Sequence, residues 1–111
     1  MIVFFHIKKM TLKHIKSDQE FKEIITEGKS VVMIHRDACP FCEKAEPWME
    51  ELSSKYSNIA AANRDDIPGI MGVFQVQMYP TFVALENGTV VETFFGDTVE
   101  DKVKGFVEKF A

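Results

Sequence analysis

The chain has 111 residues, 46% of them hydrophobic, with 13 basic and 17 acidic side chains that give a net charge of −4. This composition predicts one soluble domain with an ordinary core, and the acidic balance argues against nucleic acid as the main partner. Two cysteines are too few for a secreted disulfide scaffold or for a complete four-ligand zinc site.

The N-terminal ten residues give a separate expectation. The apolar run 1–5 is followed by Lys8 and Lys9, whereas a signal peptide has its basic residues first and a longer apolar stretch. No segment approaches the roughly 20 apolar residues of a membrane span. We therefore expect a cytoplasmic protein in which residues 1–10 form an extension or an extra edge strand ahead of a domain at 11–111.

Strand and helix patterns alternate through the first half of this domain. Residues 11–15 form a short strand candidate. Ser17 and Glu20 fit a capping box at the start of a helix that ends at Gly28. The continuous apolar run 31–34 predicts a central strand that is covered on both faces.

The second half continues the alternation. A helix starts at Pro40 and is expected to kink at Pro47, residues 57–62 predict a third strand, and Pro68 starts a short helix. Two further strands flank an Asn-Gly hairpin turn. The remaining elements are the strands 81–86 and 90–95, the turn Asn87-Gly88, and a last helix that directs Val99, Val103, Phe106, Val107 and Phe110 to the core. This βαβαβαββα order predicts a sheet between helices, with an antiparallel hairpin at one edge.

The two cysteines lie three residues apart, directly after the central strand, in Cys39-Pro40-Phe41-Cys42. At a helix N-terminus, unpaired amides and the helix dipole favour a thiolate, which is the form that attacks a disulfide. Cys39 is therefore the candidate nucleophile and Cys42 the candidate resolving thiol, while Phe41 would give the exposed tip an apolar side chain. Two structural cysteines, or half of a metal site, are the alternative interpretation of this motif.

Several residues, in this order and spacing, resemble the thioredoxin superfamily over about residues 11–111. Pro47 follows the second cysteine by five residues, and Gly96 follows Pro80 by sixteen. The other matching segments are Cys39-Pro40-Phe41-Cys42, Asn63-Arg64-Asp65, Tyr79-Pro80-Thr81 and Asn87-Gly88.

The resemblance implies a thioredoxin-like fold, a central mixed sheet of four or five strands flanked by four helices. It also implies a cis Tyr79–Pro80 bond packed over Cys39, with Tyr79, Pro80, Thr81 and Phe41 binding substrate. The implied activity is thiol–disulfide exchange on protein disulfides by a monomer that needs no cofactor or metal. Its electron donor would be a thioredoxin-reductase-like enzyme, and no nucleic acid or membrane would be involved.

Two alternative functions stay open at this point. The Pro-Phe dipeptide between the cysteines is similar to glutaredoxins, which suggests a glutathione-linked reductase. A non-catalytic module in which Cys39 and Cys42 bridge a metal or an iron–sulfur centre is the other alternative. The direction of electron flow is not predicted.

The chain departs from thioredoxins where they bury the Asp that accepts the proton of the resolving thiol. Met33 occupies that position, and Ala61 occupies that of the partner lysine. Proton transfer from Cys42 must use another group or water, and Asp37, Glu43 and Glu46 are the nearby acids. His35, four residues before Cys39, is a candidate for lowering the pKa of the Cys39 thiol as an imidazolium.

Overall fold

A five-stranded mixed sheet forms the centre of the molecule in the computed structural model, which describes residues 11–96 and 98–111. The strands are β1 (Lys13–Ile15), β2 (Lys29–His35), β3 (Ile59–Asn63), β4 (Thr81–Glu86) and β5 (Thr89–Phe95). The helices are α1 (Asp18–Ile25), α2 (Pro40–Ser53), α3 (Pro68–Val73) and α4 (Glu100–Phe110), with a 3₁₀ turn, η1 (Arg64–Asp66), after β3. The predicted βαβαβαββα order is confirmed, while the predicted extension 1–10 lies outside the described residues.

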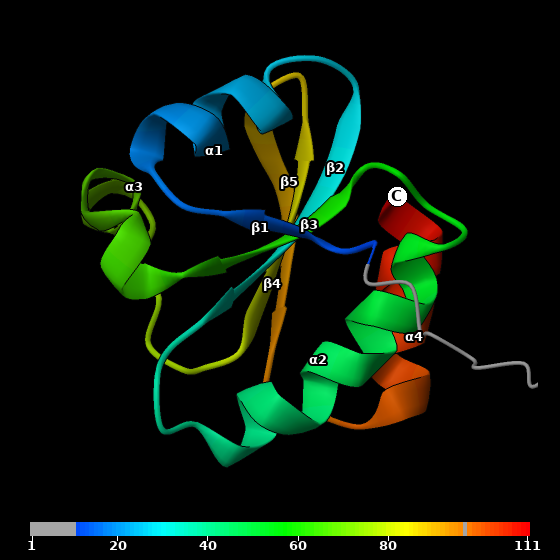
Figure 1. Cartoon of the computed structure of the whole chain (residues 1–111). Helices are drawn as coiled ribbons and strands as arrows, with labels where there is room; N and C mark the ends of the chain where they lie inside the picture. The colour runs from blue at the N-terminus through cyan, green and yellow to red at the C-terminus, as the bar shows by residue number, and fades with distance from the viewer. Residues whose placement is uncertain (1–10, 97) are drawn as a thin grey trace, which may run out of the picture.

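The strands lie in the order β1-β3-β2-β4-β5. β1, β3 and β2 run parallel to one another. β4 runs antiparallel to its neighbours β2 and β5. Helices α1 and α3 lie on one side of the sheet and α2 and α4 on the other (Figure 1). The carboxyl ends of β2 and β3 and the start of β4 therefore meet at one edge of the sheet, since Ile34 pairs with Ala62 on β3 and with Thr81 on β4.

Strand β2 is buried on both faces, which explains its continuous apolar run. Val31 and Met33 belong to the core beneath α2 and α4, whereas Val32 and Ile34 belong to the core beneath α1 and α3. Each of these four side chains is at most 1% exposed. Alternate side chains of a strand point to opposite faces, so only a strand with helices on both sides can bury such a run.

Three local predictions need correction. The first helix ends at Ile25 and not at Gly28, which has a φ of 72° and lies directly before β2. Ser17 Oγ accepts a hydrogen bond from the Glu20 amide (3.1 Å), as a capping box requires, but the Glu20 carboxylate pairs with Lys13 Nζ (3.2 Å) on β1. Val99 does not point into the core. It is 50% exposed because it precedes the first turn of α4 instead of lying within the helix.

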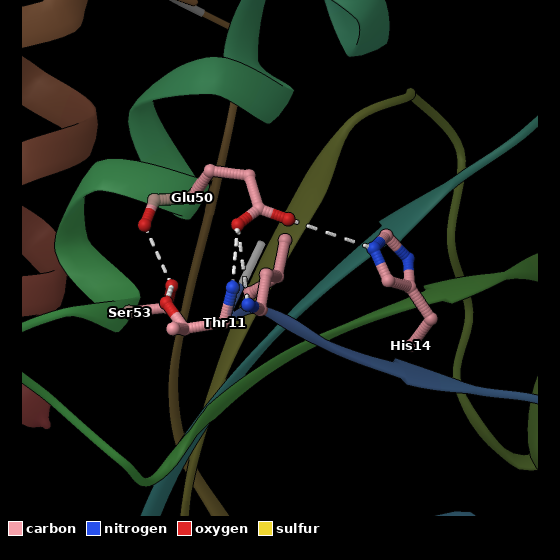
Figure 2. A network of polar contacts seen from close by, with 5 residues as sticks. Thr11, His14, Glu50 and Ser53 are labelled. Carbon is pink, nitrogen blue, oxygen red and sulfur yellow. Dashed lines mark hydrogen bonds and ion pairs between the residues drawn. The ribbon is translucent and has the colours of Figure 1, made fainter. Parts of the chain in front are cut away.

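A buried glutamate ties the start of the edge strand β1 to α2. Glu50 Oε2 accepts hydrogen bonds from the Thr11 and Leu12 amides (both 3.2 Å), and its Oε1 lies 3.8 Å from His14 Nε2 (Figure 2). Ser53, which donates to the Glu50 carbonyl (2.6 Å), also contacts the Thr11 hydroxyl. The helix that carries both cysteines is thus fixed to the sheet by polar contacts in addition to its apolar face.

We predict that Glu50→Ala lowers the free energy of unfolding by about 2–3 kcal/mol, because it removes a charged acceptor from two main-chain amides. Urea denaturation followed by circular dichroism measures this loss. Glu51→Ala is the matched control: its carboxylate, 62% exposed, pairs with Lys104 Nζ (3.0 Å) at the surface, and its loss should cost less than about 1 kcal/mol. Equal losses in the two variants would contradict the anchoring role of Glu50.

Candidate active site

The cysteine pair lies where β2 gives way to α2, and the two sulfurs form a disulfide. Cys39 is the N-cap residue of α2, and its Sγ accepts a hydrogen bond from the Cys42 amide (3.2 Å). The Cys39 carbonyl accepts the first hydrogen bond of the helix from the Glu43 amide (3.0 Å). Cys39 is 2% and Cys42 5% exposed, so little of the pair is open to water.

This placement favours negative charge on the first sulfur when the pair is reduced. The amides of the first helical turn have no acceptor within the helix, and the helix dipole is positive at this end. Cys39 Sγ already accepts from one of these amides in the oxidised form. The helix starts at Pro40, as the sequence predicted, and its first turn therefore surrounds Cys39 with the positive potential that stabilises a thiolate.

The segment before β4 lies against the disulfide. The Tyr79–Pro80 bond is cis, as the resemblance implied, and the Tyr79 carbonyl oxygen lies 3.7 Å from Cys39 Sγ. Pro80 and Thr81 are buried, and the Thr81 hydroxyl donates to the Met78 carbonyl (2.6 Å). Of the predicted substrate-binding residues, Tyr79 and Pro80 are thus beside Cys39, while Thr81 is positioned to hold their loop.

Phe41, the fourth predicted substrate-binding residue, is an exposed side chain between the cysteines. It is 58% exposed on the first turn of α2. An apolar ring so open to water is available for contact with a partner.

Two arginines lie over the ring of Tyr79. The guanidinium carbon of Arg36 is 5.9 Å and that of Arg64 5.4 Å from the ring centroid. Arg36 Nη1 also donates to the carbonyls of Asp37 and Ala38 (both 2.9 Å), in the loop that leads to Cys39. Both distances are within the range of cation–π contacts.

A small pocket of about 220 Å³ opens on the other side of the cysteine loop. Cys42, His35 and Glu46 line it together with Arg36, Asp37, Ala38 and Glu43. Because it is polar and large enough for several water molecules, the pocket can connect the Cys42 thiol to these side chains through water.

Burial lowers the pKa of His35 below its usual value of 6.5. The Glu46 carboxylate opposes this shift, His14 and Lys16 add to it, and Asp37 opposes it. His35 is therefore largely a neutral imidazole at pH 7, able to accept a proton. The predicted role of His35 as a cation that tunes Cys39 stays a prediction that this environment does not favour.

The core contains Met33 and Ala61 at the two positions where thioredoxins have a buried acid and its lysine partner, as the sequence indicated. Met33 and Ala61 are register partners on β2 and β3, each 1% exposed, and Phe82 pairs with Met33 from β4. Apolar side chains fill this row, so no proton acceptor lies there. Cys42 instead shares the lining of the pocket at the end of β2 with ionisable side chains.

Sequence reasoning missed the two arginines. The sequence patterns include Arg64 only as the middle residue of a strand-end motif, and they do not include Arg36. The sequence holds a partial signal, since each arginine closely follows a predicted strand. The pairing of His35 with Asn63, which places the two arginines side by side, is seen only in the assembled sheet.

The described residues contain no group of three or more His, Cys, Asp or Glu side chains arranged to hold a metal ion. Nor does this part of the chain include a helix with the length and apolar character needed to cross a membrane.

Comparison with known proteins gives the family. The family model described as Thioredoxin matches residues 12–109, nearly the whole chain. The chain belongs to the thioredoxin family. Thioredoxin-T of Drosophila melanogaster is 33% identical over 100 residues, which are 86% of this chain and 63% of that protein. The thioredoxin of Buchnera aphidicola is 28% identical over 98 residues, 84% of this chain and 91% of its own.

A solved structure of Plasmodium falciparum thioredoxin confirms the thioredoxin-like fold. It superimposes with a TM-score of 0.80 at 26% identity and covers 90% of this chain and 100% of that one. The chain spans less than two thirds of the length of thioredoxin-T.

Proposed function

We propose that this thioredoxin-family chain is a thiol–disulfide oxidoreductase that acts on protein disulfides through Cys39 and Cys42. The observation that carries the proposal is the disulfide at the N-terminus of α2, with the Tyr79 carbonyl 3.7 Å from Cys39 Sγ. The pair has the position that a nucleophile needs, and a main-chain acceptor beside it can pair with an extended substrate. The redox-active pair would carry the electrons itself, without a bound cofactor.

The reaction takes two exchange steps. The Cys39 thiolate attacks one sulfur of the substrate disulfide, whose other sulfur leaves as a thiolate, and a mixed disulfide forms. The Cys42 thiolate then attacks Cys39 Sγ, so that the second substrate sulfur leaves and the Cys39–Cys42 disulfide closes. Two electrons pass from the cysteine pair to the substrate.

The second step requires that Cys42 lose its proton, and we assign the acceptor to His35. Both residues line the pocket beside α2, and the lowered pKa of His35 keeps its imidazole neutral at pH 7. Water in the pocket would relay the proton, and Glu46, whose carboxylate acts on His35, would stabilise the imidazolium that forms. This route takes the place of an acid at Met33.

For the electron donor we propose a thioredoxin-reductase-like enzyme, and for the working compartment the cytoplasm, where thiols are kept reduced. A monomer suffices for this chemistry, since both cysteines and the Tyr79-Pro80 segment come from one chain.

We predict that the wild type reduces insulin disulfides with dithiothreitol as the electron source, and that Cys39→Ser abolishes this turnover. Cys42→Ser should keep the first step and accumulate a mixed disulfide with the substrate, because the resolving thiol is missing. Insulin turbidity and intact-protein mass spectrometry measure the two outcomes. Since the chain has only two cysteines, the trapped bond identifies Cys39 directly.

The same assay with NADPH and a thioredoxin reductase in place of dithiothreitol tests the donor. Turnover that stays absent with the reductase but present with dithiothreitol would overturn the proposed donor alone. A Cys39→Ser variant as active as the wild type would overturn the function.

For the proton route, we predict that His35→Phe slows the attack of Cys42 at pH 7 by about tenfold or more, because the base is removed. Stopped-flow reaction of the reduced protein with an aromatic disulfide separates a bimolecular phase, attack by Cys39, from a unimolecular one, attack by Cys42. In the wild type the unimolecular rate should fall as pH drops through the pKa of His35, below 6.5, since a protonated imidazole accepts no proton. In His35→Phe this fall should move to higher pH, because the Cys42 thiol must then give its proton to water or hydroxide.

The bimolecular phase serves as the internal control and should change less than about threefold. A slower bimolecular phase with an unchanged unimolecular one would assign His35 to Cys39 instead, and would contradict the route.

A further inference from the structure

We propose that Arg36 and Arg64, held over the ring of Tyr79, bind an acidic side chain next to the cystine of the protein substrate. This rests on the proposed function, because Tyr79 also presents the carbonyl beside Cys39. A guanidinium that stacks on an aromatic ring keeps its edge donors free, and two such groups suit a carboxylate.

The two arginines reach Tyr79 from neighbouring strand ends. Arg36 follows the last residue of β2, and Arg64 follows the last residue of β3 and opens η1. Because His35 and Asn63 are register partners in parallel strands, the next residue of each strand emerges at the same edge. Tyr79 arrives at this edge from the segment before β4, so three different segments build the cluster.

Most of the donors in this cluster have no acceptor within the described residues. Arg36 uses Nη1 for the carbonyls of the cysteine loop, but no hydrogen bond or ion pair there occupies its Nη2. Arg64 pairs through Nε with Asp65 Oδ1 (3.5 Å), in a contact where both side chains are largely exposed. Such an exposed pair is weak, and it leaves Nη1 and Nη2 of Arg64 for a ligand.

The charges around the cluster do not cancel it. Asp37, Glu43 and Glu46 line a pocket with Arg36, and Asp37 Oδ1 accepts a hydrogen bond from Asn63 Nδ2 (2.8 Å). Arg36 has no carboxylate partner within the part of the chain that the structure describes. The chain has a net charge of −4, but the surface around Tyr79, beside the disulfide, has two positive charges. An anionic group of a partner would complement them.

Contact with an acidic residue would act on substrate choice more than on chemistry. When a substrate segment pairs with the Tyr79 main chain, its cysteine lies at Cys39. The substrate residue that neighbours this cysteine then lies near the Tyr79 ring. A carboxylate there would gain two charge-assisted hydrogen bonds, whereas a lysine would face two guanidinium groups.

The test uses three cyclic peptide disulfides that differ only in the residue beside the attacked cysteine, which is Asp, Asn or Lys. With dithiothreitol as reductant, we expect kcat/KM for the Asp peptide to exceed that for the Asn peptide about fivefold and that for the Lys peptide about tenfold or more. In the Arg36→Gln/Arg64→Gln double variant, these ratios should fall to within about twofold, whatever the rate that the three peptides then share. Raising the salt concentration should shrink the wild-type preference in the same way.

Lys109→Gln is the matched control, since it removes one exposed cation on α4, where Lys109 lies over Phe110, and it should keep the preference. Equal rates of the wild type on the three peptides would overturn the proposal, as would a double variant that slows all three peptides alike, which would mark the arginines as supports for Tyr79. Arginine dependence with glutathione disulfide alone would also overturn it, in favour of a small-molecule substrate. A wild type that reduces no disulfide at all would instead refute the proposed function.

Discussion

The site depends on one junction, where a strand buried on both faces ends and a helix begins at Cys39. A shift of β2 by one residue would move Val31 and Met33 into the core beneath α1 and α3, and Val32 and Ile34 into the core beneath α2 and α4, so the packing of both cores holds this strand in place. This fixes the register of β2 against β3 and β4. The start of α2, the turn after β3 and the segment before β4 are thereby brought to one edge of the sheet.

Different environments meet at this edge. On the side of α2, a polar pocket joins Cys42 to a half-buried His35 and to Glu46. Beside Cys39, the Tyr79 ring packs against the core beneath α1 and α3, and the guanidinium groups of Arg36 and Arg64 lie over this ring. The resolving thiol thus borders groups that can take up a proton. The nucleophile borders the main-chain carbonyl of Tyr79, the residue whose ring both arginines contact. The interior row of Met33, Ala61 and Phe82 takes no part, since it is apolar throughout.

Much of this arrangement could be predicted from the sequence because it depends on local patterns. The apolar run of β2, the N-cap Ser17 and the Asn87-Gly88 turn each act over a few residues, and each gave the right element. The cis Tyr79–Pro80 bond came from the family resemblance and not from any pattern. Val99 was misplaced because helical spacing does not say where the first turn begins.

What the sequence could not give are contacts between distant segments. In the sequence, Glu50 is one of four glutamates on an amphipathic helix. Only the folded structure shows that it is buried and that it accepts hydrogen bonds from the Thr11 and Leu12 amides. In the same way, Arg36 and Arg64 are 28 positions apart, and they share a partner because two strands end side by side. Such clusters depend on register, which becomes certain only when the whole sheet is assembled.

The central claim is that the helix N-terminus makes Cys39, and not Cys42, the reactive thiolate. Competitive alkylation of the fully reduced protein at pH 7, with the two cysteines resolved by peptide mass spectrometry, measures this directly. The structure predicts that Cys39 is modified at least about tenfold faster than Cys42, because only its sulfur caps the helix. Equal rates, or faster modification of Cys42, would contradict the account.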